Sequence, residues 1–88
     1  MLTIRKLIWD SWNIQHIARH QIIPDEVEAI CHNNPVVLHG RLKNRLLLIG
    51  KTDEDRTITV VLEPKGKSVY YPITAYPSDS KDLAYIDD

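Results

Sequence analysis

The sequence predicts an α+β fold in which an N-terminal strand and two helices precede a four-stranded antiparallel meander and a short C-terminal helix. Apolar residues recur at helical spacing up to about residue 34, and beyond it they occur in short runs separated by turn residues. The length of 88 residues leaves room for one modest core. We therefore expect residues 1–88 to form a single domain.

The first elements follow from capping residues and apolar spacing. Residues 3–9 alternate loosely and are expected to form a short edge strand. Asp10 or Ser11 can cap a helix that ends at about His20. Its apolar stripe is formed by Ile14, Ile17 and Ala18. The residues expected to pack in the core or between helices are Trp9, Trp12 and Tyr85.

The second helix begins at Pro24, whose fixed φ suits the first helical turn. Asp25 and Glu26 then lie at the positive end of the helix dipole, and the residues 33–35 (Asn-Asn-Pro) end the helix. The residues expected to face the core are Val27, Ile30 and Cys31. Because Cys31 belongs to this apolar stripe, we do not expect it to act as a nucleophile.

The second half of the chain predicts strands joined by short turns, at residues 35–40, 45–51, 56–63 and 68–75. Short turns make successive strands antiparallel neighbours. Residues 45–49 and 60–62 are apolar on both faces, which is typical of central strands covered on at least one side. Pro72 lacks a ladder donor, so the last strand is an edge or is interrupted there. Ser78 can cap a C-terminal helix over residues 79–85.

The charge pattern is local rather than global. A net charge of −1 gives no overall attraction to nucleic acid. Segment 39–51, however, carries four cations and no carboxylate. Such a block is either a solvated strand edge or a surface for an acidic partner.

Targeting signals do not stand out in the sequence. No run approaches the ~18 apolar residues of a membrane-spanning helix, and the N-terminus lacks the long apolar segment of a secretory signal. The lone Cys31 agrees with a reducing compartment. We therefore expect a cytoplasmic protein without a membrane partner.

Turn length determines which residues face one another across the strands. The second hairpin turn places Arg45 opposite Leu62 or Glu63. A cross-strand ion pair with Glu63 is the simplest interpretation. The alternative is that Arg45 binds phosphate together with Arg41 and Lys43.

The third hairpin turn places Arg56 across from Ala75 and Tyr76. Lys51 falls at the same end of the sheet, and Lys81 is only a turn away from Tyr76. Three cations and a phenol suit a phosphodiester, because cations offset the charge of the transition state and a phenol can donate a hydrogen bond or stack on a base.

Arg56 also has a simpler interpretation, an ion pair with the acidic turn at residues 53–55. Its distance from Arg45 is about six residues of strand, or ~20 Å. The two arginines therefore cannot both contact one phosphate and would contact different nucleotides.

The first helix carries Asn13, His16 and His20 at helical spacing, as a polar stripe. The stripe is either a solvated face with a satisfied histidine or a site in which His20 transfers a proton or contacts phosphate. His16 and His20 can share a metal ion, but the glutamate of the H-E-x-x-H pattern is absent. Nor is there a glycine-rich phosphate loop, so we expect no metal and no cofactor.

A family resemblance rests on an ordered series of short motifs along nearly the whole chain. They are Ile8-Trp9-Asp10, Asn13, His20, EVEAI at 26–30, RLLLIG at 45–50, TDEDRTITVV at 52–61, Ile73-Thr74-Ala75, and Lys81-Asp82 with Tyr85. The series resembles the BrnT family of bacterial type II toxins. The resemblance implies a RelE-like fold and a ribonuclease that stops translation.

The same resemblance implies the partners. A small antitoxin, commonly with a ribbon-helix-helix DNA-binding domain, would neutralise the protein and repress the shared operon. Operator DNA would then be reached only through the antitoxin. The direct partners would be RNA and the antitoxin.

Several candidate residues match family positions. His20 matches the histidine that closes the first helix, Arg45 the strand arginine, Arg56 the arginine after the acidic turn, and Lys81 the cation of a basic-acidic pair. One position departs, because Tyr76 stands where the family typically has arginine. Tyrosine replaces neither the charge nor the bidentate grip of arginine.

The leading hypothesis is a metal-independent endoribonuclease toxin. A base, His20 or Lys81, takes the proton of a 2′-OH group, while Tyr76 orients a base or the leaving oxygen. The phosphate-binding residues would be Arg45, Arg56 and Lys51.

Two other hypotheses stay open. In the first, Tyr76 marks a catalytically weakened copy that binds its antitoxin and tunes repression of the operon. In the second, the chain is a metal-sensing or metal-storage domain.

Overall fold

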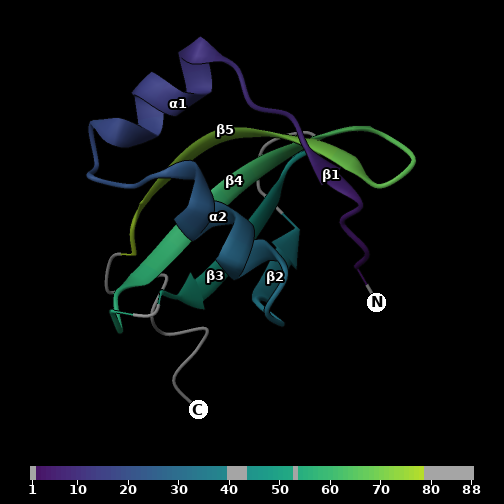
Figure 1. Cartoon of the computed structure of the whole chain (residues 1–88). Helices are drawn as coiled ribbons and strands as arrows, with labels where there is room; N and C mark the ends of the chain where they lie inside the picture. Colours follow the sequence, from purple (N-terminus) through teal and green to yellow (C-terminus); the bar gives the residue numbers. More distant parts are fainter. Residues whose placement is uncertain (1, 40–43, 53, 79–88) are drawn as a thin grey trace.

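The computed structural model describes residues 2–39, 44–52 and 54–78 (Figure 1). The elements are β1 (Lys6–Leu7), α1 (Ser11–Ala18), α2 (Pro24–Cys31), β2 (Val36–His39), β3 (Leu46–Lys51), β4 (Thr57–Gly66) and β5 (Val69–Pro77). The strands form one sheet in the order β1-β5-β4-β3-β2, in which only the β1–β5 pair is parallel. The predicted α+β order is confirmed. The expected C-terminal helix lies outside the described residues.

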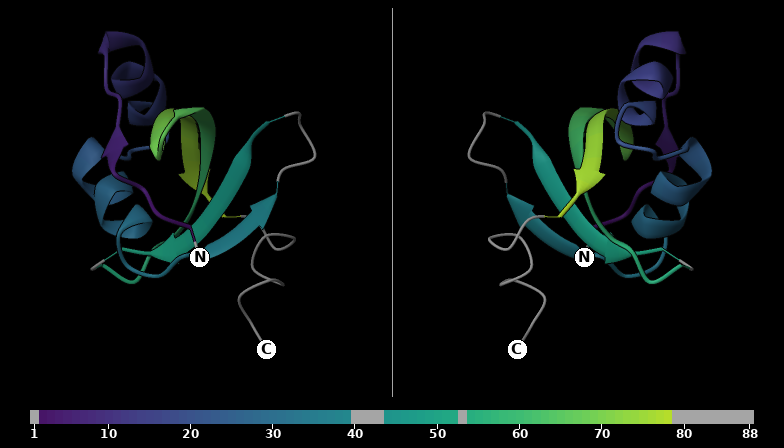
Figure 2. Two further views of the ribbon diagram at one scale, coloured as in Figure 1. Left: turned by 90° about the vertical axis from the view of Figure 1, so that its right-hand side faces the viewer. Right: turned by 90° about the vertical axis from the view of Figure 1, so that its left-hand side faces the viewer.

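Both helices lie on one side of the sheet (Figures 1 and 2). The core lies between the helices and the sheet. Its fully buried members come from both layers and include Ile17, Ile22, Val27, Ile30, Leu48, Val60 and Leu62. The predicted apolar stripe of α2 is confirmed, because Val27, Ile30 and Cys31 are all buried. Leu48 and the adjacent Ile49 are also both buried, as expected for a central strand.

The predicted apolar stripe of α1 is wrong at two of its three positions. Only Ile17 is buried, whereas Ile14 is 39% exposed and Ala18 is exposed. The helix also ends at Ala18, two residues before His20. Trp12, which we expected in the core or between helices, is 55% exposed.

Asn13 takes the buried place beside Ile17, so its expected position on a polar surface stripe is also wrong. Its Nδ2 donates to the carbonyls of Ile8 at 2.9 Å and Pro72 at 3.1 Å. Asp10 and Asn13 cap the helix reciprocally, each accepting from the other's backbone N–H. A buried amide with these partners is satisfied, and it fixes α1 on β5.

The β3–β4 register agrees with the prediction to within one residue. Leu46 faces Leu62 and Lys51 faces Thr57. Arg45 therefore lies beside Glu63, one of the two expected partners. Arg45 and Arg56 accordingly lie at opposite ends of this ladder.

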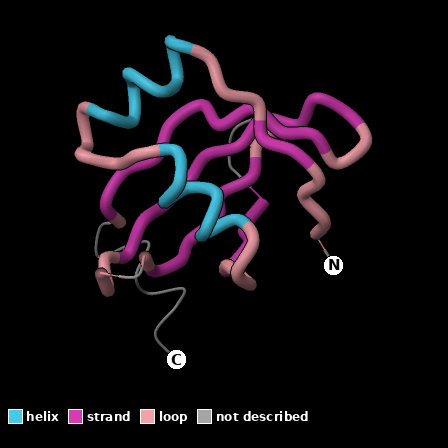
Figure 3. Tube along the Cα trace, viewed as in Figure 1, coloured by secondary structure: helices cyan, strands magenta, loops and turns pink. Residues whose placement is uncertain are grey.

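The β4–β5 register differs from the prediction by four positions. Tyr76 faces Thr59 and not Arg56. β4 continues through Pro64 to Gly66, so the tight turn falls at Lys67–Ser68 (Figure 3). Three consecutive residues with positive φ, at 66–68, make this later turn.

Two register shifts accompany the prolines of this hairpin. One lies between Pro64 and Gly66, and the other lies where Leu62 pairs with Pro72. Pro72 thus interrupts the ladder at an irregularity, which is one of the two places a strand tolerates proline. The alternative prediction was that the last strand is an edge of the sheet. It is wrong at residues 69–70, where β5 pairs with β1 on one side and lies next to β4 on the other.

Candidate functional site

Arg56 lies where β4 begins, and its guanidinium group reaches the connection between α1 and α2. Nη1 donates to the carbonyl of Gln21 at 3.0 Å, and Nη2 donates to the carbonyl of His20 at 2.9 Å. Gln21 has a positive φ of 62°, so this connection is a sharp turn. The two hydrogen bonds hold the turn against the sheet.

Arg56 forms no ion pair with Glu54 or Asp55, the two described residues of the acidic turn that was its expected alternative partner. Among the described residues no carboxylate lies within ion-pair distance of Arg56. Lys51 instead pairs with Asp55 of that turn at 3.5 Å. Asp53 lies outside the described residues.

The imidazole of His20 faces a phenol. The rings of His20 and Tyr76 meet edge to face, with centroids 6.3 Å apart and planes at 63°. Because Arg56 binds the carbonyl of His20, the structure brings His20, Arg56 and Tyr76 together. The register argument predicted a cluster of Arg56 and Tyr76 with Lys51 and Lys81, without His20. In the structure Arg56 and Tyr76 are linked through His20, by way of the α1–α2 turn and not by the β4–β5 register.

Two further rings extend this contact along α1. His16 meets His20 edge to face at 6.5 Å, and Trp12 stacks on His16 at 4.9 Å with planes 11° apart. Trp12 and His16 are spaced at i and i+4 on α1, and His20 continues the series of rings from the turn that follows the helix. We call Trp12, His16, His20 and Tyr76 the ring series. Sequence reasoning missed Trp12, although its spacing to the histidines was visible.

The other predicted cations lie in different places. Lys51 is at the same end as Arg56, opposite Thr57, but its side chain is exposed and paired with Asp55. Lys81, Arg41 and Lys43 lie outside the described residues.

Arg45 lies at the opposite end of the β3–β4 ladder, where two cations share one carboxylate. Arg45 is 3.9 Å from Glu63, and Lys65 is 2.7 Å from the same carboxylate. The hydrogen bond from Lys65 is the main cause that lowers the pKa of Glu63. The ion-pair interpretation of Arg45 is therefore confirmed.

The same network continues to the cap of α1. The ammonium of Lys65 lies 5.9 Å from the centre of the Tyr71 ring, and the hydroxyl of Tyr71 donates to Asp10. The pKa of Asp10 is lowered, chiefly by the backbone N–H of Asn13, and burial is the main cause that raises the pKa of Tyr71. We call Asp10, Glu63, Lys65, Tyr71 and Arg45 the charge network.

The sequence and the fold of the chain were compared with those of known proteins. No protein-family model matches the sequence, and no curated protein matches it. Among solved structures the chain is similar to the crystal structure of the ribonuclease toxin BrnT of Brucella abortus. The two share 25% sequence identity and a TM-score of 0.68, over 89% of this chain and 100% of that toxin. The chain has a fold similar to that of BrnT.

The likeness confirms the fold class and the resemblance that the motifs carry. It is independent of the register argument, which was wrong for β4 and β5. The site residues of this BrnT-like chain therefore depend on its own geometry, which brings His20, Arg56 and Tyr76 together.

A cleft of about 450 Å³ lies beside Arg56 in the BrnT-like fold. It is lined by Gln21, Ile23, Asp25, Glu26, Ala29, Thr52, Glu54 and Arg56. Three of these residues are carboxylates, so the cleft itself repels phosphate. An anion would approach Arg56 from the side of the ring series.

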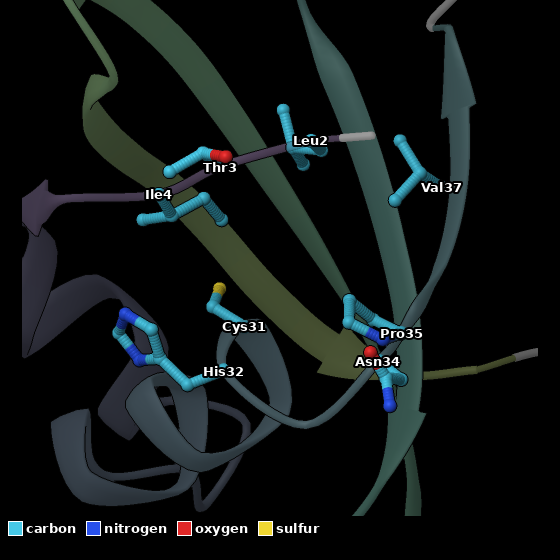
Figure 4. A pocket seen from close by; sticks show the side chains of 8 residues that line it. All are labelled: Leu2, Thr3, Ile4, Cys31, His32, Asn34, Pro35 and Val37. Atoms are coloured by element: carbon cyan, nitrogen blue, oxygen red, sulfur yellow. The ribbon is translucent and has the colours of Figure 1, made fainter.

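A second cavity, of about 420 Å³, lies between the N-terminal segment, the end of α2 and β2 (Figure 4). The residues that line it include none of the predicted site residues. Cys31 borders it, and burial raises the pKa of the thiol to about 12. The thiol is therefore protonated at neutral pH, as expected for a residue that is not a nucleophile.

Two negative findings concern the described part of the chain. Its side chains include no group of three or more His, Cys, Asp or Glu residues arranged to hold a metal ion. Neither α1 nor α2 has the length and apolarity needed to cross a membrane.

Proposed function

We propose that this chain is the toxin of a bacterial type II toxin–antitoxin system and that it cleaves RNA. The observation that carries the proposal is the likeness to BrnT, a ribonuclease toxin, across the whole of that chain. The edge-to-face contact between the rings of His20 and Tyr76 supports it, because an imidazole can act as a base and a phenol as a hydrogen-bond donor at one site.

The proposed reaction is attack by the 2′-OH of RNA on the adjacent phosphorus. His20 takes the 2′-OH proton, the new P–O bond forms, and the bond to the 5′-oxygen breaks. The products are a 2′,3′-cyclic phosphate and a 5′-OH end, which gains a proton from water or Lys81. Tyr76 donates a hydrogen bond to an oxygen of the reacting phosphate.

Arg56 has two roles in this proposal. Its bonds to the carbonyls of His20 and Gln21 position the turn that carries His20. A guanidinium group has five N–H donors, so three are left for phosphate. Because both carbonyls are neutral, the hydrogen bonds do not cancel its charge.

Expression in a bacterium tests the proposal. Induction of the chain alone should arrest growth and inhibit translation, and purified protein should cleave RNA to cyclic-phosphate ends in the presence of EDTA. Co-expression of the adjacent gene, whose product we expect to be a ribbon-helix-helix antitoxin, should restore growth. Absence of both arrest and cleavage would refute the enzyme.

A second candidate function is a weakened toxin that only binds its antitoxin and tunes repression. Two observations favour it: Tyr76 replaces an arginine of the family, and Arg56 is committed in part to backbone carbonyls. It predicts a stable complex with the product of the adjacent gene and no RNA cleavage. Mass spectrometry of the co-purified complex, together with the cleavage assay, separates the two candidates.

A further inference from the structure

The ring series begins at an exposed tryptophan that the catalytic proposal does not use. Trp12 is 55% exposed, and one face of its indole is stacked on His16. α1 lies alongside β5 at the margin of the molecule, with one side turned away from the sheet (Figures 1 and 2). An indole held flat against an imidazole keeps a fixed orientation before any ligand arrives.

Such a geometry suits a flat aromatic ligand. Nucleobases stack on exposed aromatic side chains regardless of sequence, because every base has a π-face. The indole already makes one stack, so its orientation costs little to fix on binding. The remaining rings lead from Trp12 to the pair of His20 and Tyr76.

The charge of this surface favours a nucleic acid over a basic protein. Residues 11–23 contain no carboxylate and carry Arg19 and two histidines. Phosphates would therefore meet no repulsion from α1 itself. A basic partner would find no counter-charge on the helix.

The spacing of the rings also fits a short RNA strand. The ring centroids of Trp12 and His16 lie 4.9 Å apart, and those of His16 and His20 lie 6.5 Å apart. Each of these distances spans roughly one to two stacked nucleotides, at about 3.4 Å each.

We propose that Trp12 and His16 form a base-stacking subsite for single-stranded RNA, which leads the strand to His20 and Tyr76. This proposal rests on the proposed ribonuclease function and names how its substrate is held. Trp12 acts on binding and not on the chemical step.

The test uses the full chain and a fluorescein-labelled 2′-O-methyl RNA octamer of mixed sequence, which lacks the free 2′-OH needed for cleavage. Binding is measured by anisotropy at low salt. Trp12→Ala should raise Kd about 5- to 100-fold, and Trp12→Phe should stay within about threefold of wild type because phenylalanine retains a π-face. Ile23→Ala is the matched control, since Ile23 is 56% exposed and lies outside the ring series.

An unchanged Kd in Trp12→Ala overturns the subsite, as does an equal loss in Trp12→Phe or in Ile23→Ala. So does a Trp12→Ala variant that keeps octamer affinity but loses the product of the adjacent gene, because the surface would then bind protein. Thermal unfolding checks that each variant is folded.

The two proposals fail separately. Wild type that binds the octamer through Trp12 but cleaves no RNA refutes the nuclease and supports the subsite. Wild type that cleaves RNA, with Kd unchanged in Trp12→Ala, refutes the subsite alone.

Discussion

The two ends of the β3–β4 ladder treat their arginines in opposite ways. Arg45 faces a carboxylate and belongs to the charge network, in which Lys65 binds the same Glu63 at 2.7 Å. Arg56 faces two neutral carbonyls, at 2.9 and 3.0 Å, and no described carboxylate within ion-pair distance. One guanidinium group shares a carboxylate with a lysine, whereas the other is held in place by neutral acceptors.

This difference shows what a site for an anion requires. A cation that is already paired gains little from phosphate, because a new contact must replace an existing one. A cation fixed by neutral acceptors loses none of its attraction and is oriented in advance. We therefore propose that the site lies at the end that holds Arg56, His20 and Tyr76, and the predictions test that proposal.

The largest expected effect is on catalysis by His20. His20→Ala should lower kcat for RNA cleavage by about 10²- to 10⁴-fold, the usual contribution of a general base. Arg45→Ala, at the other end, should change kcat less than about fivefold. Single-turnover cleavage of a labelled RNA measures both.

His32→Ala is the matched control for loss of an exposed imidazole, because His32 lies at the end of α2, outside the ring series. Equal losses in His20→Ala and Arg45→Ala would mean that the two ends do not differ in function. Full activity of His20→Ala would assign the proton transfer to another group.

The next effect concerns the positioning of His20 by Arg56. Arg56→Lys keeps the charge but loses the planar fork that reaches two carbonyls at once. We expect kcat to fall about 10- to 100-fold, with KM within about threefold, because the turn that carries His20 is no longer fixed. Steady-state kinetics with a short RNA separates the two constants.

A rise in KM with kcat unchanged would contradict this expectation. Arg56 would then serve only to bind substrate. The free energy of unfolding should fall by about 1 kcal/mol, which urea unfolding can measure.

The sequence could predict the pairing of Arg45, because the turn that joins β3 and β4 at the opposite end of the ladder is short. The acidic turn leaves few ways to join β3 and β4, so the position of Arg45 beside Glu63 followed from counting residues. The apolar stripe of α2 followed equally from spacing, because Val27, Ile30 and Cys31 all face the sheet.

The other end could not be predicted in the same way. The turn after β4 falls at Lys67–Ser68, which adopt positive φ without being glycine, while Gly66 ends the strand. Counting from the glycine therefore shifted Tyr76 by four positions. Its contact with His20 depends on tertiary packing of α1, which no local pattern encodes.

Asn13 shows the same limit for burial. A polar residue between apolar neighbours predicts exposure, yet its amide binds the carbonyls of Ile8 and Pro72. The second partner is 59 residues away in the chain. Trp12 shows the opposite case: it is a large aromatic residue, yet its side chain is exposed in the folded protein.

A smaller effect tests whether the charge network hides a cationic surface. Glu63→Gln removes the carboxylate that Arg45 and Lys65 share. Affinity for the 2′-O-methyl RNA octamer should rise about two- to fivefold at low salt, with a steeper salt dependence, because released cations can contact phosphate. Lys51→Gln is the opposite control and should weaken binding slightly.

If the affinity and its salt dependence are unchanged in Glu63→Gln, the bound RNA contacts only the Arg56 end of the ladder. That outcome would sharpen the contrast between the two ends rather than remove it. The free energy of unfolding should change little, as for most exposed ion pairs.

The smallest effect concerns the stability of the fold. Asp10, a member of the charge network, stabilises the start of α1. The pKa of Asp10 is lowered in the folded state by its bond to the backbone N–H of Asn13, so the folded protein favours the carboxylate. Its stabilisation is therefore present at neutral pH and is lost as the pH falls below about 4, through the lowered pKa. Asp10→Asn keeps a good N-cap but does not titrate.

We accordingly expect the melting temperature of Asp10→Asn to be slightly lower than that of wild type at pH 7 and to decline less between pH 5 and pH 3. Circular dichroism at several pH values measures both. Glu63 has a lowered pKa as well, so Asp10→Asn retains part of the slope and the Asp10→Asn/Glu63→Gln double variant should flatten it further. A double variant with the wild-type slope would mean that the acid sensitivity arises outside the charge network, which would remove the stabilising role assigned to the Arg45 end.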